Sequence, residues 1–492
     1  MQQGIGRAHD EVTSRSTDAK AFYDQGLAYL HSYVWIEAAR SFHQALRLDP
    51  SLAIAHVGLS FAYIELNKPA DAQRALDRAR DLSAAASGHD RRHIELRTLQ
   101  MASEANPRDA GKRLAYRAAL DGAVAEFPSD AELWLLKGLA ESPDPAERGQ
   151  GAVAASIPSF ERALKLSPAH FGAFHYLTHA SENTGRIKDA VTNGQQYARL
   201  APRVPHARHM LGHDLRRVGR VDDAIVEFEA ADQLSRDYFQ RENVPAEFDW
   251  HYHHNLDLLG TSYAYRGEMK KAAGLLQRAF ALPTNLVGQA VNKREWPQFL
   301  LARGRVEDSL AAARTLVAHP HPVVQTIGHI EAGYALLATG QYAATSTEAN
   351  AALRLLRAGA EGGGLATSAF EGLQGELFLR TGQREKGRQF LLQAAAKWRA
   401  APGPDAWSEA LFRLEAMARV ARDVGDWEFA DVVSRQMLDH DDAYAGSHYA
   451  AALVAEQSGD AAGARAAFAR AIKGWSHADA DLPELAVARR NR

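Results

Sequence analysis

Apolar residues recur along this chain with the three-to-four-residue period of amphipathic helices. Residues 21–50, AFYDQGLAYLHSYVWIEAARSFHQALRLDP, and residues 52–82, LAIAHVGLSFAYIELNKPADAQRALDRARDL, each predict a helix, a short turn and a second helix. The first stretch places small residues, Gly26 and Ala38, where the two helices must approach closely. Pro50 closes that stretch, because proline cannot continue a helix. The pattern therefore predicts a series of helix hairpins.

Second helices of the same kind return at SFERALKLSP (159–168), AIVEFEAADQL (224–234), AAGLLQRAFAL (272–282) and ARAAFARAIKGW (464–475). A glycine marks the predicted turn of successive units, at Gly185, Gly219, Gly267, Gly304, Gly340, Gly382, Gly425 and Gly459. This arrangement resembles the tetratricopeptide repeat (TPR), a helix–turn–helix unit of about 34 residues. The resemblance implies an all-α fold, an α-α superhelical solenoid of about twelve TPR-like helix pairs, in which the first helices line a concave groove.

The same pattern predicts how the chain is organised. The alternation of β-branched residues that is typical of strands does not compete with it. EGGGL (361–365) predicts a flexible loop, and APGPDAW (401–407) predicts a break between helices. We expect a flexible N-terminus over 1–17, N-terminal TPR-like units over 18–128, central units that carry the candidate chemistry over 129–283, and C-terminal TPR-like units over 284–492.

Composition limits the chemistry and the partners. The 492 residues are 46% hydrophobic and 24% charged, with a formal net charge of −3. This balance lacks the basic footprint of nucleic-acid or membrane binding. The chain has no cysteine, which excludes disulfides, thiolate ligands and iron–sulfur clusters, so any metal ion must be held by nitrogen and oxygen atoms. A polar start and the lack of a run of about 18 apolar residues predict a cytoplasmic location.

Histidine is concentrated in the middle of the chain. Nine of the 21 histidines lie in residues 170–254, about twice the number that an even distribution would place there. Candidate ligands stand 13, 10, 6 or 3 residues before the turn glycine in three successive first helices, and these offsets share one helix face. The set comprises His175, His179 and Glu182 before Gly185, then His206, His209 and His213 before Gly219, then His254 and Asp257 before Gly267.

These eight side chains predict a metal site in the groove. Stacked first helices lie about 10 Å apart, so we expect side chains at matching positions to converge. Imidazole and carboxylate ligands suit zinc, copper, iron, nickel or manganese. Eight ligands are too many for one ion, so either some of them orient the others through hydrogen bonds or the site holds two ions.

Three segments also resemble a group of bacterial TPR proteins, most of which have no assigned function. The segments are AHFGAFHYLTHASEN (169–183), VPHARHMLGHD (204–214) and HNLDLLGTSYAYRG (254–267). The group carries a His-x-x-x-His helix, a Pro-His-x-x-His-Met-Pro-Ser-His helix and a His-x-Leu-Asp helix. Here Leu211 and Gly212 replace the Pro-Ser pair, and Glu182 stands where Asp is usual. All the candidate ligands are retained despite these departures.

Two classes of function remain open at this stage. The first is a metal-dependent enzyme, a hydrolase or an oxidoreductase, acting on a small molecule in the groove. The second is a non-catalytic scaffold that binds a peptide or partner protein there, as TPR arrays commonly do. A metal-free groove of hydrogen-bonded imidazoles and an anion site are further alternatives. Histidine and carboxylates in register, in place of lysine, arginine and asparagine, favour the metal site.

The other histidines show no such register. We expect His31 to lie in a turn. His89 and His93 have no partner at the matching position of a neighbouring repeat. We expect His251 and His253 to lie in a loop just before a helix.

Overall fold

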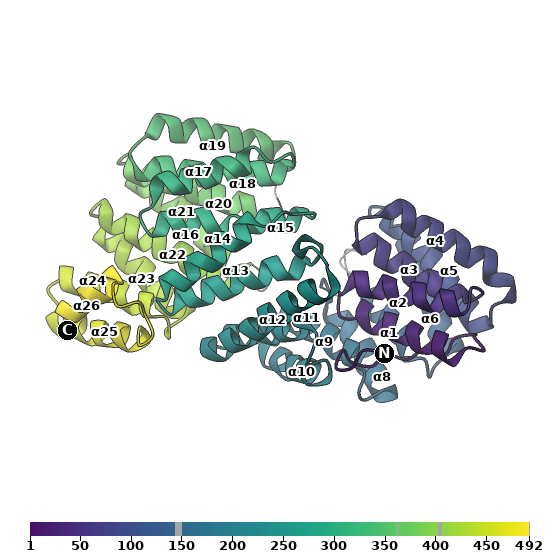
Figure 1. Ribbon diagram of the computed structural model, residues 1–492. Helices are drawn as coiled ribbons and strands as arrows, with labels where there is room; N and C mark the ends of the chain where they lie inside the picture. Colours follow the sequence, from purple (N-terminus) through teal and green to yellow (C-terminus); the bar gives the residue numbers. More distant parts are fainter. Residues whose placement is uncertain (143–149, 361, 363, 402–405, 492) are drawn as a thin grey trace. The chain divides into compact units, whose positions relative to one another are not determined.

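The computed structural model describes residues 1–142, 150–360, 362, 364–401 and 406–491, and their contacts divide the chain into two compact units, Met1–Asn243 and Val244–Arg492. Within these ranges all regular structure is helical and there is no strand (Figure 1). The expected all-α solenoid is therefore confirmed, whereas the functional regions bounded at residues 17, 128 and 283 stay predictions. Residues 361, 363 and 402–405, in the expected loop and break, lie outside the described ranges.

The first unit is a stack of helix hairpins. Its hairpins are formed by α1 with α2, α3 with α4, α5 with α6, α7 with α8, α9 with α10 and α11 with α12. The helices are α1 (Thr17–Leu30), α2 (Trp35–Leu48), α3 (Ala53–Glu65), α4 (Pro69–Leu82), α5 (Gly88–Glu104), α6 (Ala110–Glu126), α7 (Ala131–Leu139), α8 (Ile157–Leu166), α9 (Phe171–Asn183), α10 (Ile187–Leu200), α11 (Pro205–Arg217) and α12 (Val221–Glu242), with the 3-10 helices η1 (Ser83–Ala85) and η2 (Ala154–Ser156).

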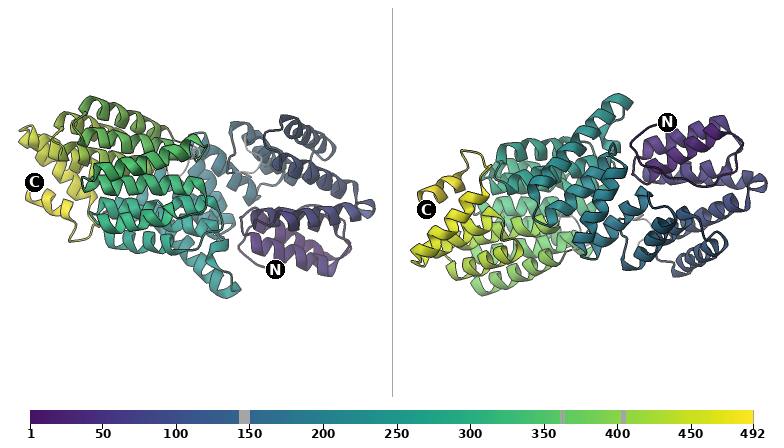
Figure 2. Two further views of the ribbon diagram at one scale, coloured as in Figure 1. Left: turned by 90° about the horizontal axis from the view of Figure 1, so that it is seen from above. Right: turned by 90° about the horizontal axis from the view of Figure 1, so that it is seen from below.

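The second unit continues the same construction. Its helices are η3 (Ala246–Phe248), α13 (Trp250–Tyr265), α14 (Met269–Ala281), α15 (Val287–Asn292), α16 (Glu295–Ala302), α17 (Val306–Val317), α18 (Pro322–Ala338), α19 (Tyr342–Arg357), α20 (Leu365–Arg380), α21 (Arg384–Ala400), α22 (Ala406–Asp423), α23 (Trp427–His440), α24 (Ala445–Gln457), α25 (Ala461–Gly474) and α26 (Pro483–Arg490). Figure 2 shows the hairpins of each unit lying side by side.

The hairpin turns depend on a left-handed residue. Gly185 and Gly219, in the α9–α10 and α11–α12 turns, have φ of 75° and 80°, a conformation that glycine adopts without a steric penalty. The α1–α2 and α3–α4 turns use Tyr33 (φ 59°) and Asn67 (φ 57°) instead. The turn glycines therefore locate the hairpins from α9–α10 onward but do not reveal the earlier ones, since the α5–α6 turn (105–109) also lacks a glycine.

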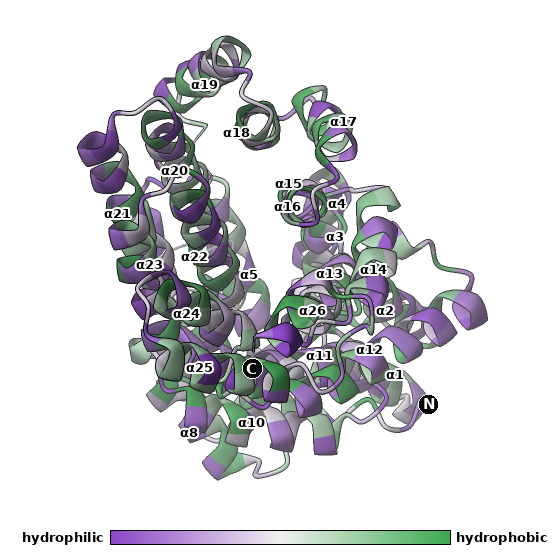
Figure 3. Ribbon diagram, turned by 90° about the vertical axis from the view of Figure 1, so that its left-hand side faces the viewer, coloured by the Kyte–Doolittle hydropathy of each residue, from purple (hydrophilic) through white to green (hydrophobic). Residues whose placement is uncertain are grey.

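Close packing inside several hairpins follows from small residues that face aromatic rings. A Cβ atom added to Gly26 on α1 would lie 2.5 Å from the ring of Phe42 on α2. At Gly138 on α7 it would lie 2.3 Å from the ring of Phe160 on α8. Both rings are fully buried. The hydrophobic faces buried this way alternate with hydrophilic faces on the same helices (Figure 3).

Residues 1–16 form no helix but contact the rest of the first unit. Arg203 donates its backbone N–H to the carbonyl of Gly4 (2.9 Å). Ile5, Ala8 and Val12 are buried. This N-terminal segment therefore lies along the helices of its own unit. Nowhere in the described part of the chain does a helix combine the length and apolar character needed to cross a membrane.

Candidate metal centre

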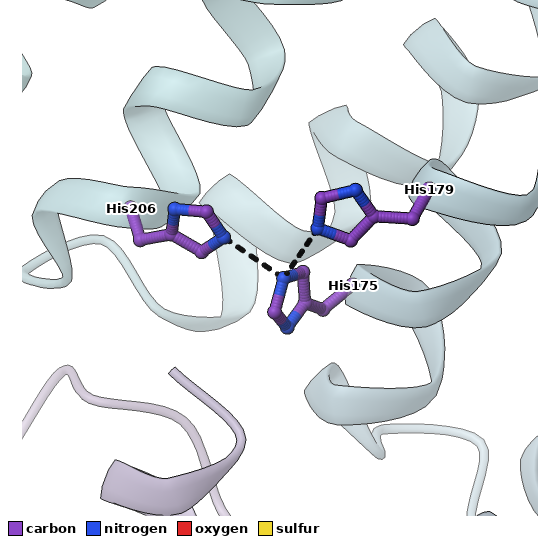
Figure 4. A group of neighbouring side chains, drawn as sticks. All are labelled: His175, His179 and His206. Carbon is purple, nitrogen blue, oxygen red and sulfur yellow. Dashed lines mark hydrogen bonds between the residues drawn. The ribbon is translucent and has the colours of Figure 1, made fainter. Parts of the chain in front are cut away.

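Three of the predicted ligands converge in the first unit (Figure 4). His175 and His179 lie on α9, four residues apart, and His206 lies in the first turn of α11. The Nε2 atom of His175 is 3.1 Å from Nε2 of His179 and 2.9 Å from Nε2 of His206. All three side chains are buried. The expected convergence of these two helices is therefore present in the structure, and we refer to the three residues as the histidine trio.

The orientation of His175 is set by a backbone atom of a distant turn. Its Nδ1 donates to the carbonyl oxygen of His31, at 2.7 Å, in the α1–α2 turn. A carbonyl can only accept, so Nδ1 carries the proton of the neutral ring and Nε2 keeps its lone pair. That lone pair points at His179 and His206. Metal-binding histidines usually donate such a hydrogen bond from the ring nitrogen that does not bind the metal, which fixes the orientation of the ring.

The spacing of the trio suits either of two states. Imidazole nitrogens on one tetrahedral zinc ion, with bonds of about 2.0–2.1 Å, stand about 3.3 Å apart. The observed 2.9 and 3.1 Å are hydrogen-bond distances, a few tenths of an ångström shorter. Without an ion, His179 and His206 would each donate Nε2–H to His175. A small outward shift of the rings would convert this arrangement into a ligand set.

The site is buried, and burial favours the neutral form of His179. Burial lowers the pKa of His179 to about 4, and Glu182 opposes this shift only in part. The ring of Tyr197 stacks on His175, with centroids 4.8 Å apart, and the ring of Tyr33 lies 5.0 Å from that of His206. A neutral ring keeps a lone pair for a metal ion at neutral pH. Burial thus prepares these side chains for ligation.

The remaining candidates of the first unit lie next to the trio, with a different register from the expected one. His213 Nδ1 is 3.7 Å from Oε1 of Glu182, and the rings of His209 and His213 are 4.4 Å apart. Arg217 shares Glu182, with Nη1 3.3 Å from the same oxygen. Counted back from the turn glycine of each hairpin, these contacts join position 6 of α11 (His213) to position 3 of α9 (Glu182).

The trio shows the same offset, since His206 at position 13 meets His175 at position 10. Matching positions are therefore displaced by one helical turn between these neighbouring hairpins.

His254 and Asp257 lie on α13 in the second unit. There Asp257 Oδ2 is 3.1 Å from His253 Nδ1. Convergence of His254 and Asp257 with the trio stays a prediction. The expected loop position of His251 and His253 is wrong, because α13 already begins at Trp250. Asp249 caps it by accepting the backbone N–H groups of His251 and Tyr252.

Sequence patterns missed a buried network behind the trio. Glu132 on α7 lies 2.9 Å from Nε2 of His31 and 3.0 Å from Nε2 of His170, and Nδ1 of His31 lies 2.9 Å from the hydroxyl of Tyr176. Burial opposes the charge of Glu132, but the two imidazoles outweigh it and hold the pKa of Glu132 below its usual range. Because His31 also orients His175, the network supports the trio.

A second missed group consists of Asp10, His89, His93 and Asp130, whose donor atoms approach one another closely enough to share a metal ion. No periodicity relates these positions, since they come from three distant parts of the sequence. His89 and His93 at least carry the i, i+4 spacing of a helical metal-binding pair.

A cavity of about 100 Å³ lies beside the trio within the first unit. Its lining includes His31, Tyr33 and Tyr176, which touch the trio, together with apolar side chains such as Leu27 and Phe61. A small molecule in this space would lie next to the rings that enclose the three imidazoles.

No protein-family model and no curated protein is similar enough to match the chain. Among solved structures it is similar to PilW, a widely conserved type IV pilus biogenesis factor, at 17% identity over 45% of this chain and 94% of that one, with a TM-score of 0.28. It is also similar to the Cut9–Hcn1 hetero-tetramer of the APC/C (11% identity, 96% of each chain, TM-score 0.35).

A third similar structure is human IFIT1 with PPP-AAAA (12% identity, 86% of this chain and 90% of that one, TM-score 0.42). At such low identity these likenesses concern the fold alone. The stacked hairpins and left-handed turns of the structure itself form an all-helical solenoid, the kind of fold that tetratricopeptide repeats build.

Proposed function

We propose that this protein binds a transition-metal ion between His175, His179 and His206 and acts as a metal-dependent enzyme on a small molecule. The observation that supports this most directly is the approach of two buried Nε2 atoms, those of His206 and His179, to within 2.9 and 3.1 Å of Nε2 of His175. Three imidazoles leave a fourth position of a tetrahedral ion open for water or substrate. An open position distinguishes catalytic sites from closed structural ones.

The candidate metals are zinc, copper, iron and manganese, and the three imidazole nitrogens of the trio favour some of them over others. Neutral imidazoles suit zinc, copper and iron, whereas manganese prefers oxygen ligands. Glu182 is the predicted carboxylate on α9 itself, and it already interacts with Arg217 and His213. We therefore expect zinc or copper. A bound ion would supply an acidic coordinated water or, if oxidisable, redox chemistry.

The protein's own residues have distinct parts in such a centre. His31 orients His175 through its carbonyl, and Tyr33 and Tyr197 keep bulk water from the rings. The neighbouring cavity of about 100 Å³ limits the substrate to a small molecule. Which reaction class applies, hydrolysis or oxidation, then depends on the metal that the protein retains.

The test is the metal content of the full-length protein purified without a histidine tag. We expect a transition metal that falls by about one equivalent per chain in His206→Gln. The matched control is His43→Gln, because His43 is a partly exposed histidine of the same unit that bonds to Tyr63. Equal metal content in the wild type and His206→Gln would overturn the proposal, and circular dichroism checks that each variant is folded.

A trio that never binds metal would favour the alternative, a scaffold that binds a peptide or partner protein. The second unit offers a place for this function in a cavity of about 380 Å³. Aromatic side chains, among them Trp398 and Phe412, line it together with ion pairs such as Arg413 with Glu331, 2.8 Å apart.

A further inference from the structure

A second group of metal-type donors lies in the first unit, formed by Asp10, His89, His93 and Asp130. His89 and His93 occupy one face of α5, four residues apart. Asp130 is the N-cap of α7, where its Oδ1 accepts the backbone N–H of Leu133 at 3.1 Å. That bond leaves Oδ2 directed at the histidines. Asp10 reaches the group from the N-terminal segment, residues 1–16.

The distances inside this group are those of ligands around one ion. Nε2 of His89 lies 3.3 Å from Asp10 Oδ1 and 2.7 Å from Asp130 Oδ2. Nε2 of His93 lies 3.6 Å from Asp10 Oδ2 and 3.5 Å from Asp130 Oδ2. Donor atoms on a tetrahedral zinc ion stand about 3.3 Å apart. The four separations lie between 2.7 and 3.6 Å, and one donor atom from each residue lies within 4.8 Å of the other three, close enough to share one ion.

Hydrogen bonding alone accounts poorly for the same group. Only the contact of His89 with Asp130 has the length of a good hydrogen bond, since N–H···O bonds run to about 3.2 Å. Asp10 Oδ2 and His93 Nε2 are buried and make no hydrogen bond within the described part of the chain. A buried polar atom without a partner costs free energy and calls for an explanation. A shared cation would satisfy both atoms at once.

We propose that Asp10, His89, His93 and Asp130 bind a divalent transition-metal ion, best matched by zinc, that fastens the N-terminal segment to α5 and α7. Two imidazoles and two carboxylates complete a tetrahedral shell and cancel the charge of the ion. A closed shell is typical of a structural site, in contrast to the open trio. The two sites share no residue.

The consequence concerns the segment that carries Asp10. Its other polar contacts near that residue are His9 Nδ1 with Asp24 Oδ2 (2.8 Å), Asp10 N–H with Asp24 Oδ1 (3.4 Å), Thr13 N–H with Asp90 Oδ2 (3.2 Å) and Ser87 N–H with Thr13 Oγ1 (3.3 Å). Asp10 and His93 also line the cavity beside the trio. An ion bound by Asp10 and His93 would therefore fix the position of one wall of that cavity.

The experiment is limited trypsin digestion of the full-length protein, stripped with a chelator and then titrated with zinc. Arg7 and Arg15 are exposed and flank Asp10, so cleavage there reports whether the segment is docked. We expect zinc to slow this cleavage about tenfold or more, in line with the stabilisation that ligand excess confers. His93→Gln and the milder Asp10→Asn should lose both this protection and one equivalent of metal.

The trio serves as the matched control. His206→Gln should keep the zinc protection of Arg7 and Arg15 while losing its own equivalent, so failure of one site is distinguished from failure of the other. Unchanged metal content in both Asp10→Asn and His93→Gln would show that the group is an ion-pair network. Metal lost without any change in cleavage would refute the fastening role.

Discussion

At the scale of single residues, buried polar side chains of the first unit support one another across long sequence distances. His31 joins α1 to α7 through Glu132, and its carbonyl orients His175 on α9. Glu132 accepts from a second imidazole, that of His170 at the start of α9. One carboxylate thus bridges two histidines that flank the candidate centre, and its removal should be felt in stability and in metal binding.

Glu132→Gln should lower the free energy of unfolding by about 3 kcal/mol at pH 7, because it removes the buried carboxylate that two imidazoles share as a hydrogen-bond partner. An amide also turns an N–H group toward one of the imidazoles. Urea denaturation measures the loss, and Glu161→Gln on the exposed face of α8 is the control. An effect no larger than that of the control would contradict the assigned role of Glu132.

The pH dependence of this loss has a definite sign. The folded protein lowers the pKa of Glu132 below its ordinary value of 4.5. The carboxylate therefore contributes stability that is fully present above pH 4.5 and is lost as the pH falls toward the folded pKa. The gap between the wild type and Glu132→Gln should be constant from pH 7 to about pH 5 and narrow below that.

The trio was accessible to sequence reasoning for a specific physical reason. His175, His179 and His206 stand at repeated distances from turn glycines, and a repeat transfers such distances into space. Asp10 and Glu132 carry no comparable signal, since one lies in a nonhelical segment and the other in a helix without a histidine. Tertiary packing between parts of the chain that are distant in sequence brings them to their partners.

At the scale of elements, several hairpins, among them α7 with α8, are held by contacts that leave no room for an added methyl group. Gly138→Ala should destabilise the protein by about 1–3 kcal/mol, the usual cost of overpacking, because the new Cβ would lie 2.3 Å from the Phe160 ring. The control is Gly122→Ala on the neighbouring helix α6, where nothing lies within 4 Å.

At Gly122 the substitution should stabilise by about 0.5–1 kcal/mol, since alanine is the better helix former. Thermal unfolding compares the two variants. Similar shifts of the melting temperature in the same direction would contradict the packing argument.

The relative register of neighbouring hairpins could not be predicted from the sequence. Equal offsets from the turn glycines suggested that equal positions meet, yet α9 and α11 meet one turn out of step, as His206 with His175 shows. The displacement depends on how far one hairpin slides along the next. That sliding is set by the packing of whole helix faces rather than by any single residue.

At the scale of the whole molecule, each of the two units contains hydrophobic clusters of its own. The cluster around Phe160 and Tyr176 belongs to the first unit, and the clusters around Tyr334 and Phe468 belong to the second. Each unit exceeds the size of a typical domain of about 100–150 residues. Contacts in a hairpin stack are mostly between neighbours, which favours independent folding of a sufficiently long part.

We therefore expect residues 1–243, produced alone, to fold and to retain the metal of the full-length protein. All donors of the trio and of the second group lie in this unit. Circular dichroism, cooperative unfolding and metal analysis test the expectation, with residues 244–492 as the comparison. A folded fragment that has lost the metal of the trio would show that His254 and Asp257 of α13 complete that centre. Retention would assign the centre to α9 and α11 alone, because the three imidazoles would then suffice for binding.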